Sequence, residues 1–130
     1  MKTAQEYKDS LRRRNIKVYL KGELLDPKTL IDHPFIRGHV NAAAMTYALA
    51  GTKEYENLMT TASHLTGKKI NRFTHIHQST DDLVKKVKML RMISQKTGTC
   101  YQRCVGIDAM NATYSVTYEI VQAMGTNYHE

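Results

Sequence analysis

The chain has 130 residues, of which 42% are apolar, and a formal net charge of +7 at pH 7. This length predicts one domain or part of one, and the apolar fraction supports a packed core and excludes intrinsic disorder. No apolar run approaches the roughly 18 residues of a membrane-spanning helix, and no apolar segment typical of a signal peptide follows the charged N-terminus. Two cysteines without a secretory signal favour a reducing cytoplasm.

The positive charge suits several classes of partner, namely nucleic acid, acidic membranes and anionic ligands with phosphate groups. No nucleic-acid-binding motif accompanies it, so a solvated basic face is favoured over nucleic-acid binding. We therefore expect neither a nucleic-acid nor a membrane partner.

The N-terminal region predicts a helix followed by a short extended segment. Residues 3–14 are expected to be helical, because Thr3 and Glu6 have the spacing of a capping box and three arginines suit the C-terminal end. The segment "IKVYLKGELL" alternates apolar and polar residues around a Lys-Gly pair, which predicts a short β excursion near residues 16–25.

The central region predicts turns and further helices. Both prolines lie in residues 25–35, which indicates a loop or short turns. The stretch "VNAAAMTYALAG" predicts a helix of small residues that ends at Gly51. Residues 53–65 predict a further short helix, and residues 68–78 an irregular or extended segment.

A clear amphipathic helix is expected over "DDLVKKVKMLRMISQK", with Ser79 or Thr80 as its N-cap and Gly98 near its end. Its apolar spacing predicts a buried stripe flanked by two further apolar residues. The stripe would consist of Leu83, Val87 and Leu90, with Val84 and Ile93 on its shoulders.

The final predicted element runs from about Cys100 to Met124. It is apolar on most sides, which is typical of a helix buried among other helices. The fold class predicted for the chain is therefore mainly α, with little strand.

Cys100 and Cys104 are the only cysteines, and several kinds of site would explain their spacing. On a helix they would share a face, about 40° and about 6 Å apart. This arrangement disfavours a mutual disulfide and a single zinc ion, and it favours an iron–sulfur cluster that binds each thiolate through a different iron. A reactive dithiol and two ordinary buried cysteines stay open. Lys96 and Arg103 would lower the thiol pKa values and favour ligation.

Two other groups of polar residues are candidates. A polar strip continues the cysteine face along the last helix and indicates either a buried polar site or a solvent-facing surface. It consists of Asp108, Asn111, Ser115, Glu119 and Gln122. His75 and His77 would point to one side of an extended segment, as some metal ligands do, although such a pair more often belongs to a polar loop.

Several stretches resemble the N-terminal region of the 4-hydroxybutyryl-CoA dehydratases, above all "HQSTDDL", "QKTGTCYQRCVG" and "GTNYHE". These enzymes are also vinylacetyl-CoA Δ-isomerases and belong to the 4-hydroxyphenylacetate 3-hydroxylase group of flavoproteins. The resemblance covers essentially the whole chain. It implies that residues 1–130 form an N-terminal helical domain, similar to that of acyl-CoA dehydrogenases, of a larger three-domain flavoenzyme.

The resemblance also implies a reaction and its cofactors. Members carry FAD and a [4Fe-4S] cluster, assemble as homotetramers, and convert 4-hydroxybutyryl-CoA to crotonyl-CoA by a radical route. Their cluster has three cysteine ligands and one histidine, and two of the cysteines match Cys100 and Cys104. The position of Gln102 matches a residue of the active-site surroundings, although on a regular helix Gln102 would point away from the cysteine face.

The other ligands, the main catalytic residues and most FAD contacts of these enzymes lie in later domains. We therefore expect the chain to be inactive alone and to need the remaining domains or a partner chain. The hydroxylase branch lacks the cysteine pair, which disfavours a 4-hydroxyphenylacetate 3-monooxygenase-like enzyme. A non-catalytic helical assembly module, with structural cysteines, is the alternative from another class.

Overall fold

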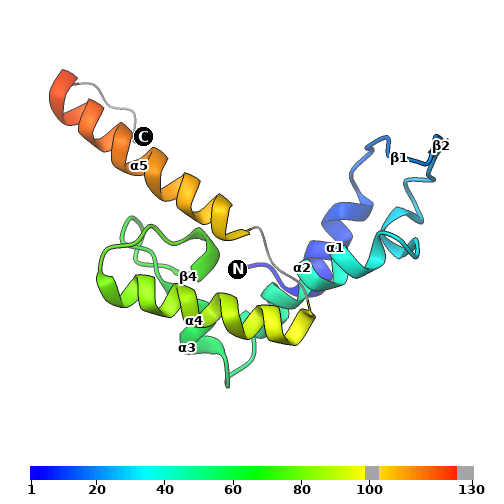
Figure 1. Ribbon diagram of the computed structural model, residues 1–130, viewed down its shortest axis with the longest axis horizontal. Coiled ribbons are helices and arrows are strands. Elements are labelled where there is room, and N and C mark those ends of the chain that lie inside the picture. Colours follow the sequence, from blue (N-terminus) through cyan, green and yellow to red (C-terminus); the bar gives the residue numbers. More distant parts are fainter. Residues whose placement is uncertain (99–102, 126–130) are drawn as a thin grey trace. The chain divides into compact units, whose positions relative to one another are not determined.

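The computed structural model describes residues 1–98 and 103–125, without the side chains of residues 103–105. These residues form two compact units, Met1–Asn57 and Leu58–Glu130. They are mainly helical, as predicted, with two short antiparallel hairpins (Figure 1). None of the helices in the described ranges combines the length and apolar character needed to traverse a lipid bilayer.

The first unit begins with the predicted helix, α1 (Ala4–Arg12), and its capping box. Thr3 Oγ1 accepts a hydrogen bond from Glu6 N at 3.1 Å, and the Glu6 carboxylate accepts one from Thr3 N at 2.7 Å. The predicted β excursion is confirmed as a hairpin of β1 (Tyr19–Leu20) and β2 (Glu23–Leu24). Its turn at Lys21 and Gly22 has positive φ at both residues, which matches the twist of a tight hairpin.

The core of the first unit lies between α1, the 3-10 helix η1 (Leu30–Asp32) and α2 (Arg37–Ala50). As predicted, residues 25–35 form turns and α2 ends at Gly51. The rings of Tyr7 on α1 and Tyr47 on α2 stack with their centroids 4.9 Å apart. The buried apolar residues of this core are Leu30, Ile31, Val40, Ala44, Leu49 and Ala50.

The predicted helix over residues 53–65 is wrong beyond one turn. The α3 helix (Glu56–Met59) gives way to β3 (Thr60–Ala62), which pairs antiparallel with β4 (Lys69–Asn71). Two consecutive β-branched residues, Thr60 and Thr61, favour the strand, and pairing with β4 supplies its hydrogen bonds. The segment expected to be irregular or extended thus forms β4 and then the 3-10 helix η2 (Arg72–Thr74).

The α4 helix (Thr80–Thr97) has the predicted ends. Ser79 is its N-cap and accepts a hydrogen bond from Asp82 N at 3.2 Å, and Gly98 ends it in the left-handed conformation at φ 64°. Glycine adopts this conformation without the steric penalty of a side chain, so it suits a helix end.

The predicted buried stripe of α4 is wrong at most of its positions. Leu83, Val84 and Val87 are 45–47% exposed and Leu90 is half-buried, whereas Ile93, expected at the edge of the stripe, is fully buried together with Met89. The inward face follows Asp82, Lys86, Met89 and Ile93, one residue or about 100° away from the predicted stripe. On this face the Asp82 carboxylate contacts the buried Arg72 and His75.

The last helix, α5 (Arg103–Met124), is not buried among helices of the described chain, in contrast to the prediction. Only Ile107, 3% exposed, is fully buried among its described side chains. Large apolar residues elsewhere on the helix are exposed to solvent, namely Met110, Val116, Tyr118, Ile120 and Met124. Its apolar character therefore exceeds what this chain covers.

Candidate functional site

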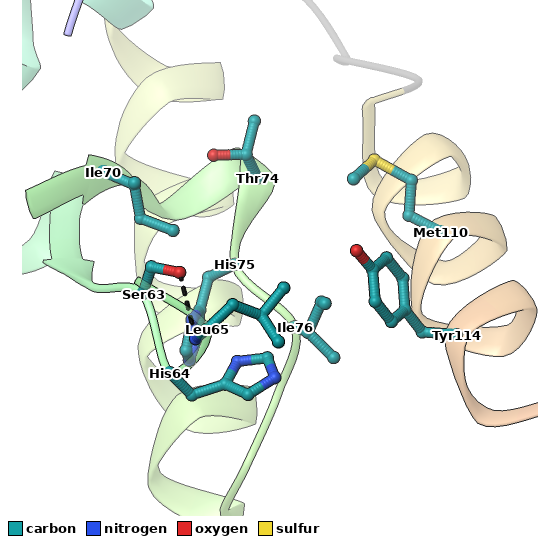
Figure 2. Close-up of a pocket in the computed structure, with 9 residues that line it drawn as sticks. All are labelled: Ser63, His64, Leu65, Ile70, Thr74, His75, Ile76, Met110 and Tyr114. Atoms are coloured by element: carbon teal, nitrogen blue, oxygen red, sulfur yellow. Dashed lines mark hydrogen bonds between the residues drawn. The ribbon is translucent and has the colours of Figure 1, made fainter. Parts of the chain in front are cut away.

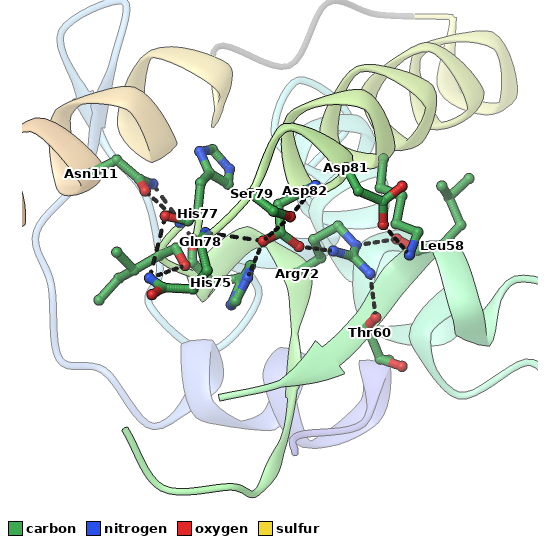
Figure 3. Close-up of polar contacts among 12 residues, drawn as sticks. Leu58, Thr60, Arg72, His75, His77, Gln78, Ser79, Asp81, Asp82 and Asn111 are labelled. Atoms are coloured by element: carbon green, nitrogen blue, oxygen red, sulfur yellow. Dashed lines mark hydrogen bonds and ion pairs between the residues drawn. The ribbon is translucent and has the colours of Figure 1, made fainter. Parts of the chain in front are cut away.

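A buried arginine organises the second unit. Arg72, in η2, is 3% exposed, and its guanidinium donates to Leu58 O at 2.9 Å and Thr60 O at 2.8 Å (Figure 3). It also pairs with Asp82 Oδ1 at 3.2 Å. A buried cation is tolerated only when it is paired and its donors are satisfied, and both conditions hold here.

Asp82 is the anion that balances this arginine. Its carboxylate accepts hydrogen bonds from Gln78 N at 3.0 Å and Ser79 Oγ at 3.2 Å, and it lies 3.2 Å from His75 Nε2. Burial raises the pKa of Asp82, but the hydrogen bonds from Gln78 N, His75 and Ser79 outweigh it and hold the pKa at about 2. Asp82 is therefore ionised at neutral pH. We call Arg72, His75 and Asp82 the polar centre.

His75 completes the polar centre, and His77 lies two residues further on. The His75 side chain is 4% exposed, and its Nε2 faces the Asp82 carboxylate. Among the described residues, His75 Nδ1 and His77 Nε2 are buried without a hydrogen-bond partner. Burial lowers the pKa of His77, and the nearby Lys86 and His75 lower it further. Both histidines lie in the irregular segment between η2 and α4, as the polar-loop interpretation expects, and His75 Nε2 is paired with Asp82. The described residues bring no third metal-ligating side chain to this pair.

Asn111 connects α5 to this region. Its Oδ1 accepts a hydrogen bond from His77 N at 2.7 Å, and its Nδ2 donates to His75 O at 3.4 Å (Figure 3). Nδ2 also donates to Ile107 O at 2.9 Å, which holds the amide against its own helix. The side chain therefore pairs with the extended backbone of residues 75–77 as a neighbouring strand would.

One further polar contact joins α4 to α5. The Lys86 ammonium, whose side chain is 12% exposed, pairs with the Asp108 carboxylate. Together with buried Ile107 and with Asn111, it leaves α5 held through the part of the helix that lies closest to Cys104 in sequence.

A small cavity of about 90 Å³ lies where α5 meets the 63–76 segment (Figure 2). Its walls are largely apolar, and His75 and His64 also line it. The polar Ser63 and Thr74 are occupied locally, since Ser63 Oγ accepts from Leu65 N and Thr74 Oγ1 donates to Asn71 O. The apolar lining residues are Leu65, Ile70, Ile76, Met110 and Tyr114.

The predicted site residues are only partly described. Cys100 and Gln102 lie outside the described residues. Cys104 is in the first turn of α5, and its side chain is likewise outside them. The assignments of Cys100 and Cys104 as metal ligands and of Gln102 as an active-site residue therefore stay predictions.

The predicted polar strip divides into two parts. Asp108 and Asn111 make the contacts to Lys86 and to residues 75–77, whereas Ser115, Glu119 and Gln122 are exposed. The roles of Arg72 and Asp82 were not predicted from the sequence. The available signal was an arginine between Ile70 and Phe73, ten residues before an aspartate in the first turn of a helix.

The two cysteines of this chain can supply two of the four protein ligands of a [4Fe-4S] cluster. Two cysteines supply thiolates of the kind that ligate [4Fe-4S] clusters, which need four protein ligands. Within the described ranges, no group of three or more His, Cys, Asp or Glu residues is placed to hold a metal ion. Any complete ligand set must therefore include residues beyond those described.

Comparison with known proteins places these features in a family. Residues 3–130 match the family described as 4-hydroxyphenylacetate 3-hydroxylase N terminal. The chain is 57% identical over 128 residues, 98% of its length, to a 4-hydroxybutyryl-CoA dehydratase/vinylacetyl-CoA-Δ-isomerase of Clostridium aminobutyricum. It spans only 26% of that relative.

Comparison with solved structures supports the same family assignment. An oxygen-tolerant archaeal 4-hydroxybutyryl-CoA dehydratase from N. maritimus matches with a TM-score of 0.86 and 51% identity, over 98% of this chain and 25% of that one. HpaB, the oxygenase component of 4-hydroxyphenylacetate 3-monooxygenase, matches with a TM-score of 0.63 and 24% identity, over 74% of this chain and 20% of its own, and shares the fold. The chain therefore belongs to the 4-hydroxyphenylacetate 3-hydroxylase N-terminal family and resembles the N-terminal region of 4-hydroxybutyryl-CoA dehydratases.

Proposed function

We propose that this chain is the N-terminal part of a dehydratase that contains FAD and a [4Fe-4S] cluster. The enzyme converts 4-hydroxybutyryl-CoA to crotonyl-CoA, isomerises vinylacetyl-CoA, and works as a cytoplasmic homotetramer. The observation that carries the proposal is the 57% identity to the clostridial dehydratase/isomerase over nearly the whole chain. The two cysteines provide independent chemical support, because thiolates are the usual protein ligands of iron–sulfur clusters.

Within this enzyme, Cys100 and Cys104 hold the cluster with two thiolates, and Gln102 lies near the reacting groups. When bound, the cluster supplies a Lewis acid for the substrate hydroxyl, and FAD supplies a one-electron partner. The basic charge of the chain complements the phosphates of acyl-CoA and FAD. The remaining ligands come from the rest of the enzyme, so the 130-residue chain alone does not turn over substrate.

Anaerobic purification of the native gene product tests the proposal. Iron, acid-labile sulfide and flavin would be measured on the same sample, beside the rate of crotonyl-CoA formation. We expect four irons per active site, with both iron and activity lost in Cys100→Ser and in Cys104→Ser. Ser115→Ala, a change on the exposed part of α5, is the matched control and should keep both.

Three results would overturn the proposal. A native protein free of iron and flavin would exclude the cluster enzyme and favour an assembly module. Full activity in both cysteine variants would exclude the thiols as cluster ligands and make them structural. An iron-free, flavin-dependent hydroxylation of 4-hydroxyphenylacetate would instead indicate an HpaB-like monooxygenase.

A further inference from the structure

The α5 helix meets the rest of the second unit partly through its N-terminal half. Among its described side chains Ile107 is buried, and Asn111 and Tyr114 are half-buried. Direct polar contacts across this junction include the Lys86–Asp108 pair and the hydrogen bonds of Asn111. These contacts help to set the orientation of α5.

Asn111 has the more demanding geometry of the two polar contacts. An ion pair such as Lys86–Asp108 tolerates rotation, because a lysine ammonium is a point charge on a flexible stem. The Asn111 amide instead uses both its oxygen and its nitrogen on His77 N and His75 O, which defines a plane and a register. The backbone of residues 75–77, to which Asn111 is hydrogen-bonded, is held in place because the His75 side chain is buried against Asp82.

Helix geometry links this contact to the cysteine. Cys104 precedes Asn111 by seven residues, which corresponds to about 10 Å along the axis and about 20° around it. The two positions thus lie on one face of α5, two turns apart. A rotation of the helix at Asn111 would turn position 104 by the same angle.

We propose that Asn111 is a positioning residue for the half-site at Cys104, which it orients by docking α5 onto the backbone of residues 75–77. The inference rests on the proposed function, because it assigns Cys104 to the cluster. Asn111 acts through the orientation of α5 rather than by holding the ligand itself, so we expect an effect at the lower end of the about 10- to 100-fold loss of metal affinity that follows removal of an outer-sphere partner.

The test compares Asn111→Ala with three other variants. Asn111→Asp keeps an oxygen that accepts from His77 N and loses the donated bonds, so it should have an intermediate effect. Thr113→Ala changes an exposed residue of the same helix, and Ile93→Val trims a fully buried side chain of α4. All four are made in the native gene product, where iron content and the EPR spectrum of the reduced cluster are recorded.

A second readout needs no cluster. In a Cys100→Ser background of the native gene product, the alkylation rate of Cys104, followed by peptide mass spectrometry, reports its surroundings. We expect Asn111→Ala to lower iron affinity by about tenfold or more, shift the EPR spectrum and change the alkylation rate several-fold. Ile93→Val should lower the melting temperature and leave all three unchanged.

Equal iron affinity, EPR spectrum and alkylation rate in Asn111→Ala and Thr113→Ala would overturn this inference and leave the proposed function intact. Matching changes in Ile93→Val would also overturn it, because general destabilisation would then explain them. If Asn111→Ala fails to fold, the same comparison is made with Asn111→Asp. An unmodified protein without iron would refute the proposed function itself.

Discussion

The polar centre and α5 lie in the same unit and are stabilised in opposite ways. Arg72 and His75 are buried and Asp82 is 14% exposed, and the three contact one another, the backbone of β3 and the loop before α4. The α5 helix is mostly apolar, yet its described side chains are largely exposed, and its one buried described residue, Ile107, lies near its N-terminal end. One region is complete within this chain, and the other is not.

This difference indicates which surface of the chain contacts other domains in the complete protein. The groups of a buried polar network need specific hydrogen-bond partners, and a group left without one destabilises the fold. Exposed apolar surface can instead be buried by any surface of complementary shape. The relatives that this chain matches are about four times longer. We therefore expect the exposed apolar side of α5 to lie against other domains in the complete protein.

The largest expected effect is the loss of Asp82. Asp82→Ala would leave Arg72 buried without its counter-charge, which typically costs about 3–5 kcal/mol. The free energy of unfolding, measured by urea denaturation, should fall by this amount. Asp81→Asn removes the neighbouring, exposed pair with Lys85 and should cost less than about 1 kcal/mol. If both variants lose a similar free energy of unfolding, the polar centre stabilises the fold no more than an exposed ion pair does.

Acid should weaken the same centre. The pKa of Asp82 is about 2 in the folded chain and near 3.8 when unperturbed, so its contribution is complete above about pH 4. It is lost as the pH falls toward 2, where the folded-state carboxylate takes up a proton. Melting temperatures across this range should fall less steeply in Asp82→Ala than in the unmodified chain. If the melting temperatures of the two proteins fall equally steeply with pH, Asp82 is not the group whose protonation weakens the fold.

Two side-chain truncations on α5, one buried and one exposed, test which part of the helix packs against the rest of the unit. Ile107→Ala should cost about 2 kcal/mol or more, as is usual for a buried isoleucine, and should release α5 to hydrogen exchange. Val116→Ala removes a side chain that is 53% exposed and should change the free energy of unfolding by less than about 0.5 kcal/mol. A large cost at Val116 would mean that α5 is covered within this chain after all.

A smaller effect is expected at the start of α4. Ser79→Ala removes the N-cap bond to Asp82 N and should cost about 1 kcal/mol in unfolding experiments. Thr80→Ala, at the adjacent exposed position, is the control and should be nearly neutral. If the cost at Ser79 greatly exceeds that of a cap, its second bond, from Ser79 Oγ to Asp82, supports the polar centre.

Local chemistry made several elements predictable. The capping box at Thr3, the turn at Lys21–Gly22 and the glycine ends at Gly51 and Gly98 all follow from short-range rules that tertiary contacts did not override. Residues 60–62 did not follow, because β3 needs a partner strand that only the hairpin provides. The candidate ligands Cys100 and Cys104 came from spacing and resemblance, and they stay predictions.

By itself, the sequence determined the mainly α class, the positions of the helix caps and the family to which the chain belongs, because these depend on local residue patterns and on overall similarity. The tertiary structure decided which face of α4 is buried and what Asn111 contacts. Apolar spacing alone predicted a buried face through Leu83 and Val87, whereas the face that lies inward carries Asp82, the partner of buried Arg72, and differs by one residue or about 100°. A buried ion pair joins residues from different elements, so it exists only once the chain has folded.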